Sequence, residues 1–308
     1  MSVAPEILVG TLLVAVLYGV GLWRQRRKHG AAARWRHWAF FSGLGAVFVA
    51  LQSPLDALAD RSFFMHQLQH LLLQMLGPML LMLAAPQALL AAGVPLALRR
   101  AALAPALTSR PVREVFGVLA RPWVAALLMV ASLYVWHWPP YHDLAVLDES
   151  MHYLMHSSLL AAGLLFFAAI FDPRPPPLGA RYGTRVSILW AAMTANVVLG
   201  AALALKDEPL YAAYDRAARL WQMSALADEQ LGALVMWIPG SALCVPAFFV
   251  LLRLWSSQEA RIEARRRRGI SSPAAAANHR TALWLALVAF AGFAGTLGIG
   301  LLVTGPHS

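Results

Sequence analysis

Long apolar runs alternate with short polar segments along almost the whole chain of 308 residues. A helix that crosses a membrane needs about 20 mostly apolar residues to span roughly 30 Å of hydrocarbon. The runs that approach this length are predicted to be spans: 6–23, 37–54, 63–85, 122–138, 151–171, 185–205, 228–255 and 281–303. The pattern predicts an all-α integral membrane protein, a polytopic bundle of about eight (seven to eight) transmembrane helices in one domain, residues 1–308.

The segments between the runs differ in charge. Arginine is concentrated in four of them: 24–36, 86–121, 172–184 and 256–280. Carboxylates are concentrated in the alternate ones: 55–62, 139–150 and 206–227. Because basic loops usually remain in the cytoplasm, we predict that both termini and the acidic loops lie on the outer side, and that 256–280 is a basic cytoplasmic linker. The net charge of +10 then reflects membrane topology, and no nucleic-acid partner is expected.

Composition narrows the class further. Hydrophobic residues make up 59% of the chain and charged residues 13%, which excludes an ordinary soluble domain. The single cysteine, Cys244, excludes an internal disulfide and a Cys-x-x-Cys motif, and packing is its expected role. The first residues lack the basic stretch of a signal peptide, so the first run is expected to be a retained helix.

Two histidine pairs stand at the beginnings of predicted spans. His66 and His70 begin the third span, and His152 and His156 begin the fifth. Residues four apart share a helix face, with Cβ atoms roughly 5–6 Å apart, which suits two ligands of one metal ion. Both spans are predicted to start at the outer side, where the fourth span ends at His137, so these five histidines form a candidate metal site.

Other side chains near these histidines have candidate supporting roles. Met155 lies three residues after His152, and its thioether would favour Cu(I), whereas imidazole alone suits copper, zinc or iron. Gln74 continues the polar stripe four residues after His70. Five carboxylates on the same predicted side could orient imidazole rings: Asp56, Asp148, Glu149, Asp228 and Glu229. His142 falls in a loop and is expected to be solvated.

Three expectations concern helix shape and packing. Segment 86–121 is half apolar and is predicted to lie at the membrane interface rather than to form a further span. Pro239 with Gly240, and Pro246, predict a kink or an unwound turn in the seventh span. Asn196, near the middle of the sixth span, is expected to bridge two helices.

Several motifs, in this order, resemble the CtaG-type cytochrome c oxidase assembly factor family of bacterial plasma membranes. They are Leu51-Gln52-Ser53-Pro54-Leu55, Met65-His66-Gln67-Leu68-Gln69-His70 with Gly77-Pro78, Trp136-His137-Trp138-Pro139-Pro140-Tyr141, Met151-His152-Tyr153-Leu154-Met155-His156 with Phe171-Asp172-Pro173, and Asp228-Glu229-Gln230-Leu231-Gly232 with Met236-Trp237-Ile238-Pro239-Gly240. The resemblance covers about residues 35–255. It implies a multi-pass plasma-membrane protein that supports assembly of haem–copper oxidase, with oxidase subunits or other assembly factors as partners and copper as the expected metal. It implies functional roles for the five histidines and Asp228, and no catalytic reaction.

Four functions remain open from the sequence. The first is an assembly factor that binds copper at its outer face and passes it to an oxidase subunit. The second is a membrane oxygenase or hydroxylase, since His-x-x-x-His pairs also build di-iron sites. The third is a haem protein ligated across the outer helix ends, and the fourth is a scaffold whose histidines hydrogen-bond one another. The decisive quantity is the distance between the two histidine pairs.

Overall fold

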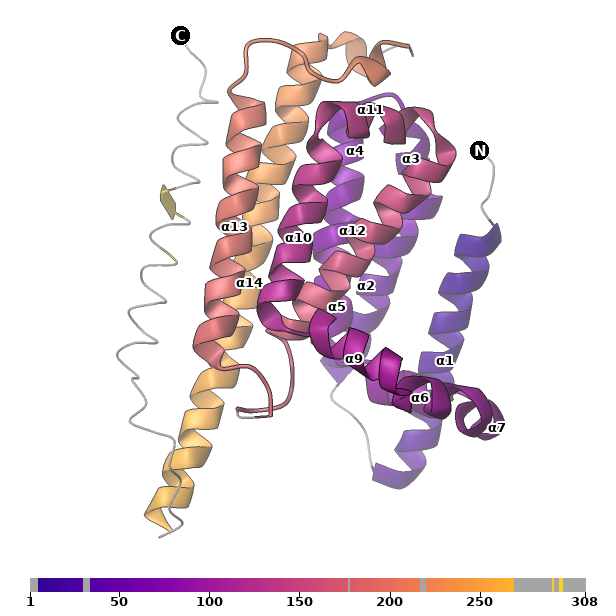
Figure 1. Ribbon diagram of the computed structural model, residues 1–308, viewed down its shortest axis with the longest axis vertical. Helices are drawn as coiled ribbons and strands as arrows, with labels where there is room; N and C mark the ends of the chain where they lie inside the picture. Colours follow the sequence, from indigo (N-terminus) through magenta and orange to yellow (C-terminus); the bar gives the residue numbers. More distant parts are fainter. Residues whose placement is uncertain are drawn as a thin grey trace.

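A computed structural model describes residues 5–29, 34–176, 178–216 and 220–268, with the isolated positions 290, 294 and 295. Within these residues every regular element is a helix, and the long helices stand side by side (Figure 1). The elements on the N-terminal side of residue 110 are α1 (Pro5–His29), α2 (Arg34–Gln52), α3 (Pro54–Ala59), α4 (Phe63–His70), the π-helix η1 (Leu71–Leu76), α5 (Gly77–Leu83), α6 (Gln87–Gly93), α7 (Leu96–Leu98), the π-helix η2 (Arg99–Leu103) and α8 (Ala104–Thr108). The remaining elements are α9 (Arg110–Leu119), α10 (Pro122–His137), α11 (Pro139–Leu147), α12 (Glu149–Ile170), α13 (Tyr182–Ala204), the 3-10 helices η3 (Ala212–Arg216) and η4 (Leu220–Gln222), and α14 (Ala225–Arg267).

The helix bounds agree with the predicted spans to within a few residues at most ends. Four helices are long and apolar enough to cross a membrane: Pro5–Gln25, Glu149–Ile170, Tyr182–Ala204 and Ala225–Arg265. The number rises to six if each of two bent helix pairs is one span: Phe63–Leu83 with Gln87–Gly93, and Arg110–Leu119 with Pro122–His137. The last predicted span, 281–303, lies outside the described residues apart from isolated positions. The described residues therefore form an all-helical structure with four to six candidate membrane spans, while eight spans and outward-facing termini remain predictions.

Helix α14 differs in detail from the predicted seventh span. It continues to Arg267, so the first part of the expected basic linker is helical. Pro239 and Pro246 lie inside this helix, and the helical backbone continues through both. Of the two predicted alternatives, the unwound turn is therefore wrong, and the kink stays a prediction. In the turn before Pro239, Asn196 of α13 donates a 2.8 Å hydrogen bond to the carbonyl oxygen of Met236. The predicted bridging role of Asn196 is thus confirmed.

Segment 86–121 forms short helices along one end of the bundle. Helix α6 is bent by 78° from the helix before it, and α9 is bent by 71° from α10. None of the residues of α7, α8 and α9 is buried, and Val115, Phe116 and Val118 expose apolar side chains. The segment contains no straight span of its own, and its position at the membrane interface stays a prediction.

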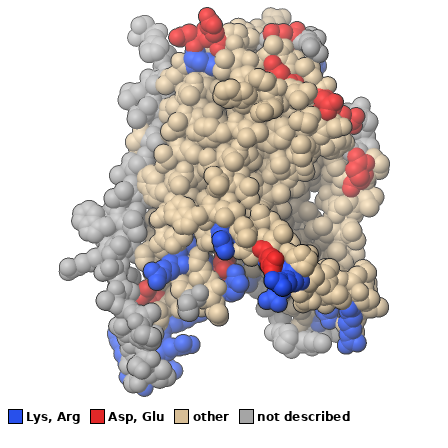
Figure 2. All heavy atoms as spheres, viewed as in Figure 1, with Lys and Arg blue, Asp and Glu red and all other residues tan. Residues whose placement is uncertain are grey.

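The two ends of the bundle differ in charge. Lysine and arginine gather at the end formed by α6–α9 and the C-terminal part of α14, while most of the visible carboxylates lie toward the opposite end (Figure 2). Large apolar side chains are exposed between the ends, as on α1 at Val9, Leu13 and Val16. The starts of α4 and α12, the end of α10 and the whole of α11 meet at the acidic end, above the hydrophobic core shared by α10, α12, α13 and α14.

Candidate metal centre

The helix that carries the first histidine pair is fixed at its start by hydrogen bonds. Ser62 is the N-cap of α4 and its hydroxyl accepts a 3.4 Å hydrogen bond from the backbone N–H of Met65. The carboxylate of Asp228, on α14, accepts hydrogen bonds from the Ser62 hydroxyl at 2.6 Å and from the N–H of Phe63 at 2.8 Å. Asp228 was expected to orient an imidazole. The structure gives it the different role of satisfying free N–H groups at the helix start.

The helix that carries the second pair lies directly against the third span, which carries the first pair. The Asp148 carboxylate caps α12 by accepting a 2.9 Å hydrogen bond from the N–H of Met151. Farther along α12, a Cβ atom at Gly163 would lie 2.3 Å from the carbonyl oxygen of Gln74 in η1. Only glycine permits this approach of the two backbones, and the approach brings His156 toward α4.

The two histidine pairs meet. The Nε2 atoms of His66 and His70 are 2.9 Å apart, and those of His152 and His156 are 3.2 Å apart. Between the pairs, the ring centroid of His66 lies 5.6 Å from that of His152, and His70 lies 5.6 Å from His156. At these separations the two pairs form one cluster, which the sequence could not establish.

Two overlapping sets of side chains in this cluster could hold an ion. The potential ligand atoms of His66, His70 and His156 all lie within 4.8 Å of one another, and so do those of Asp56, His152 and His156. Among the described residues no other group of three or more His, Cys, Asp or Glu side chains is so closely spaced. The first set is buried and made of imidazole alone, whereas the second contains a carboxylate and two half-buried residues.

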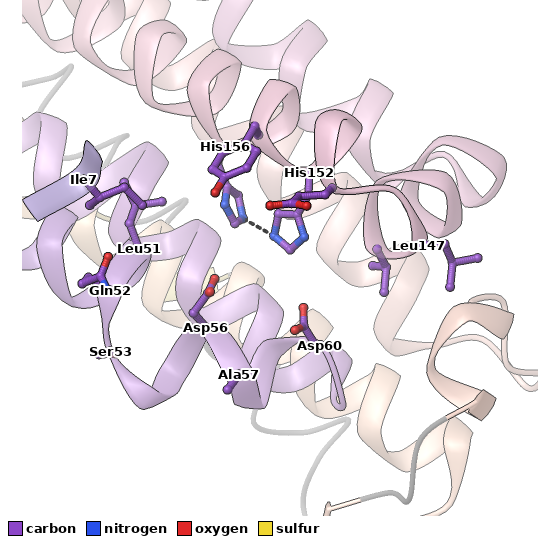
Figure 3. Close-up of a pocket in the computed structure, with 13 residues that line it drawn as sticks. Ile7, Leu51, Gln52, Ser53, Asp56, Ala57, Asp60, Leu147, His152 and His156 are labelled. Atoms are coloured by element: carbon purple, nitrogen blue, oxygen red, sulfur yellow. Dashed lines mark hydrogen bonds between the residues drawn. The ribbon is translucent and has the colours of Figure 1, made fainter. Parts of the chain in front are cut away.

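A cavity of about 600 Å³ opens beside the second set. Asp56, Asp60, His152 and His156 point into it (Figure 3), and the exposed Glu149 also lines it. Burial raises the pKa of Asp60, an effect that nearby His152 opposes and Asp56 reinforces. Asp56 accepts a 2.7 Å hydrogen bond from the side-chain amide of Gln69, which also bonds the carbonyl oxygen of Ala50. Asp56 is therefore held in place toward the second pair.

His137 lies at the edge of the cluster with both ring nitrogens in hydrogen bonds. Its Nδ1 is 2.6 Å from the carbonyl oxygen of Leu133, and its Nε2 is 2.9 Å from the side-chain oxygen of Gln67. The amide nitrogen of Gln67 has no partner. Turning that amide by 180° would let its N–H donate to Nε2 while the ring N–H donates to Leu133. His137, a predicted ligand, is not part of either closely spaced set among the described residues.

The expectation that His142 is solvated is wrong. Its side chain is fully buried, with its ring centroid 5.0 Å from that of His66. The ring donates from Nδ1 to the carbonyl oxygen of Trp136 and accepts at Nε2 from the Tyr214 hydroxyl, both at 2.9 Å. Burial lowers the pKa of His142 to about 3, helped by His137 and opposed by the Trp136 hydrogen bond. Burial also raises the pKa of Tyr214 well above its ordinary range, so this hydroxyl remains a donor.

Two other predicted site residues face elsewhere. Met155 is completely buried in an apolar cluster with Trp136, Ala145 and Leu159. Gln74 donates hydrogen bonds to the carbonyl oxygen of Met129 at 3.2 Å and to the Ser132 hydroxyl at 3.0 Å. Both of these partners belong to α10, so Gln74 links η1 to α10 instead of extending the histidine cluster.

Four supporting residues were missed by sequence reasoning: Ser62, Gln69, His142 and Tyr214. Ser62 immediately precedes the apolar run that begins at Phe63, and serine is a preferred N-cap residue. The sequence near Ser62 therefore indicated a helix start there. The Pro139-Pro140 pair was also a signal, because proline is favoured in the first turn of a helix and here begins α11, which carries His142 inward. Nothing in the sequence pairs Gln69 with Asp56 or Tyr214 with His142, since those contacts join distant segments.

The ring nitrogens of the inner set are incompletely satisfied by the protein. Nδ1 of His66 and Nδ1 of His70 are buried without a hydrogen-bond partner, while the Nε2 atoms face each other. An unpaired buried polar group costs about 1–3 kcal/mol, so each of these nitrogens requires a partner, which an ion or a water molecule would supply. Three convergent imidazoles with no thiolate among them suit a first-row ion such as copper or zinc.

The comparisons with known proteins agree with this architecture. Residues 16–258 match the family model described as cytochrome c oxidase caa3 assembly factor, a range that includes all the predicted 35–255 core. An uncharacterised protein of Mycobacterium bovis and one of Mycobacterium tuberculosis are each 28% identical over 264 residues, and one of Mycobacterium leprae is 27% identical over 274. Each alignment covers 85% of this chain and 40% of the relative, so the chain spans about 40% of the length of these relatives. No solved structure matches. The chain belongs to the cytochrome c oxidase caa3 assembly factor (CtaG) family.

Proposed function

We propose that this protein binds copper at the His66–His70–His156 set and supplies it during assembly of a haem–copper cytochrome c oxidase. The observation that carries the proposal is the convergence of imidazole ligand atoms from α4 and α12 within 4.8 Å. Copper is here a cargo that the protein holds and passes on, and no catalytic reaction is proposed. The partners would be oxidase subunits or other assembly factors.

The chemistry of the ligand set fits copper. Imidazole binds copper strongly, and copper stands above zinc and iron in the usual order of affinities for divalent ions. His137 and His142, whose ring nitrogens bond Leu133, Gln67, Trp136 and Tyr214, would hold the ligand-bearing helices in place.

We further propose that the site faces the outer side of a bacterial plasma membrane. The helix starts that carry the two histidine pairs lie toward one end of the bundle (Figure 1). Carboxylates gather toward that end, opposite the end where Lys and Arg gather (Figure 2). Under the positive-inside rule the basic end remains in the cytoplasm. This orientation would present copper to the compartment where an outward-facing metal centre is assembled.

A membrane metalloenzyme of the di-iron type is the second candidate. Asp56 favours it, since a carboxylate lies beside His152 and His156, and carboxylates are common in iron sites. The other carboxylates of the cavity, Asp60 and Glu149, belong to neither closely spaced set. Metal analysis of the purified protein separates the two candidates, because an iron-loaded, copper-free protein that consumes oxygen with a lipid substrate would favour the enzyme.

The experiment that tests the proposal compares metal content and complementation. The wild-type protein and a variant with alanine at His66, His70, His152 and His156 are purified from cells grown with copper. The matched control is His37→Gln, which removes an imidazole that bonds Tyr18 at the start of α2. We expect copper in the wild type and control, and its loss in the quadruple variant, together with loss of oxidase copper in cells that depend on the variant. Wild-type copper content in the quadruple variant would overturn the proposal.

A further inference from the structure

We propose that Asp56, His152 and His156 form a second metal site, open to the cavity, through which the ion reaches and leaves the buried site. The inference rests on the proposed function, because it takes the His66–His70–His156 set to be the place where copper is held. It adds a carboxylate ligand and a route that the family resemblance does not supply. The same protein would thus hold one ion in either of two positions.

The two sets differ in access to solvent. His66 is completely buried and His70 is 4% exposed, and neither lines the 600 Å³ cavity. Asp56 and His152 are half-buried and do line it (Figure 3). An ion arriving from outside therefore meets Asp56 and His152 before it can meet His66.

His156 belongs to both sets, and this determines how they can work together. Its Nε2 lies 3.2 Å from that of His152, and its ligand atom lies within 4.8 Å of the ligand atoms of both His66 and His70. We take the same His156 nitrogen to serve both sets. Because one imidazole nitrogen binds one ion, the two sets are then alternative positions rather than sites filled together. Exchange of Asp56 and His152 for His66 and His70 moves the ion inward while His156 stays bound, and no bond other than metal–ligand bonds changes.

The charge of the cavity favours cations at the outer position. Asp56, Asp60 and Glu149 contribute carboxylates to its wall, and the described lining includes no lysine or arginine. A concave wall with charge of one sign concentrates ions of the opposite sign. Glu149 is exposed on the first turn of α12, so it contributes charge without being part of the ligand set.

The ligand atoms define the chemical class of the ion. One carboxylate oxygen and two imidazole nitrogens suit a divalent first-row cation, such as Cu²⁺ or Zn²⁺, better than a soft monovalent ion. Gln69 orients Asp56 through a 2.7 Å hydrogen bond, and Gln69 lies on α4 between the two inner ligands His66 and His70. Asp56 is thus bound to the helix that carries the two inner imidazoles.

The test uses the full chain in detergent with Cu²⁺ alone as the probe. In a His66→Gln/His70→Gln background the outer position is the remaining set, and we expect Cu²⁺ to bind there with an electron paramagnetic resonance spectrum of mixed oxygen and nitrogen ligands. Adding Asp56→Asn should weaken this binding about tenfold or more, as loss of a ligand or its support does at other metal sites. Glu149→Gln is the matched control, since it removes the same charge from the same cavity wall and should leave the spectrum unchanged.

A second measurement covers the case in which the double background does not fold. In the otherwise wild-type protein, Asp56→Asn should leave the equilibrium affinity for Cu²⁺ unchanged and slow the loading of Cu²⁺ in a stopped-flow experiment. Loading at the wild-type rate, or a folded double background that binds no Cu²⁺, would overturn the outer site and leave the proposed function standing with one site. Failure of the wild-type protein to bind copper would overturn both.

Discussion

The carboxylate of Asp228 accepts a 2.6 Å hydrogen bond from the hydroxyl of Ser62, so a residue of α14 holds the residue that begins α4. The same carboxylate also accepts from the backbone N–H groups of Phe63 and Phe64, at 2.8 and 3.2 Å. His66 follows within one turn. The position of His66 therefore depends on the side chain of Asp228, which is 162 residues later in the chain (228 − 66).

Replacement of Asp228 by alanine should lower both stability and copper affinity. Loss of a capping group at a helix start costs about 0.5–2 kcal/mol, and the Ser62 hydroxyl would also lose its partner. Thermal unfolding followed by tryptophan fluorescence should show a lower Tm, and copper titration a higher Kd. Asp207→Ala, at an exposed carboxylate that follows the end of α13, is the control. Unchanged Tm and Kd in Asp228→Ala would show that this contact does not position the site.

Replacement of Gly163 by alanine should separate the two histidine helices. The added Cβ would lie 2.3 Å from the Gln74 carbonyl oxygen, so α12 must move away from η1. Overpacking of this kind costs about 1–3 kcal/mol, and His156 would move away from His66 and His70. Gly45→Ala is the matched control, because nothing lies within 4 Å of a Cβ at that glycine of α2. Equal copper affinity in the two variants would argue against close packing as the cause of the convergence.

His70 and His137 should respond differently to substitution by glutamine. His70 belongs to the inner set, so His70→Gln should reduce copper affinity by at least about tenfold. His137 bonds Leu133 and Gln67 with its two ring nitrogens, so His137→Gln should lower Tm and change copper affinity less. Competition titration with a chromophoric chelator measures the copper dissociation constants of the two variants. An equally large loss of affinity in His137→Gln would identify His137 as a ligand.

Asp172 should stabilise the opposite end of the bundle in a pH-dependent way. Burial raises its pKa, but hydrogen bonds and charge from Arg174, with a contribution from Arg185, outweigh burial and hold the pKa below its ordinary value of 3.8. The ionised carboxylate is therefore favoured by folding. Its stabilising effect is complete above about pH 3.8 and is lost as the pH falls through the lowered pKa.

The measurement compares Asp172→Asn with the wild type across that range. The variant should have the lower Tm at pH 7, and the difference should shrink as the pH falls below about 4. Arg110→Gln, in an exposed pair with Glu114, is a control that should have little effect at any pH. A difference in Tm that stays constant down to pH 3 would show that the Asp172 charge does not contribute.

Sequence patterns predicted the helices and the main ligands because these depend on local spacing. The bounds of α10 and α12 follow from apolar length, and the pairing of His66 with His70 follows from the four-residue helical repeat. The meeting of the two pairs could not be predicted in the same way. It depends on which helices are neighbours, and that in turn depends on backbone contacts such as the one between Gly163 and Gln74.

The wrong predictions for His142 and Asp228 also result from contacts between segments that are distant in the sequence. His142 was assigned to a solvated loop because α11 is short and polar at its start, yet α11 folds over the cluster and buries that ring. Asp228 was expected beside an imidazole because it shares their predicted side of the membrane, whereas a free helix terminus was its nearer partner. The predicted side of the membrane indicates how deep a residue lies, and it does not indicate which residues lie next to it.

The π-helix from Leu71 to Leu76 divides the third span into halves with different rotational phase. A π-turn accommodates an extra residue relative to an α-helix, and one residue corresponds to a rotation of about 100° about the axis. The half that presents His66 and His70 is therefore out of phase with the half that packs Gly77 against α2. A helical wheel drawn across the entire span would assign the faces of one half incorrectly. A single-residue deletion in this stretch would remove the extra residue, so the span should continue as a regular α-helix in which both halves keep their present faces.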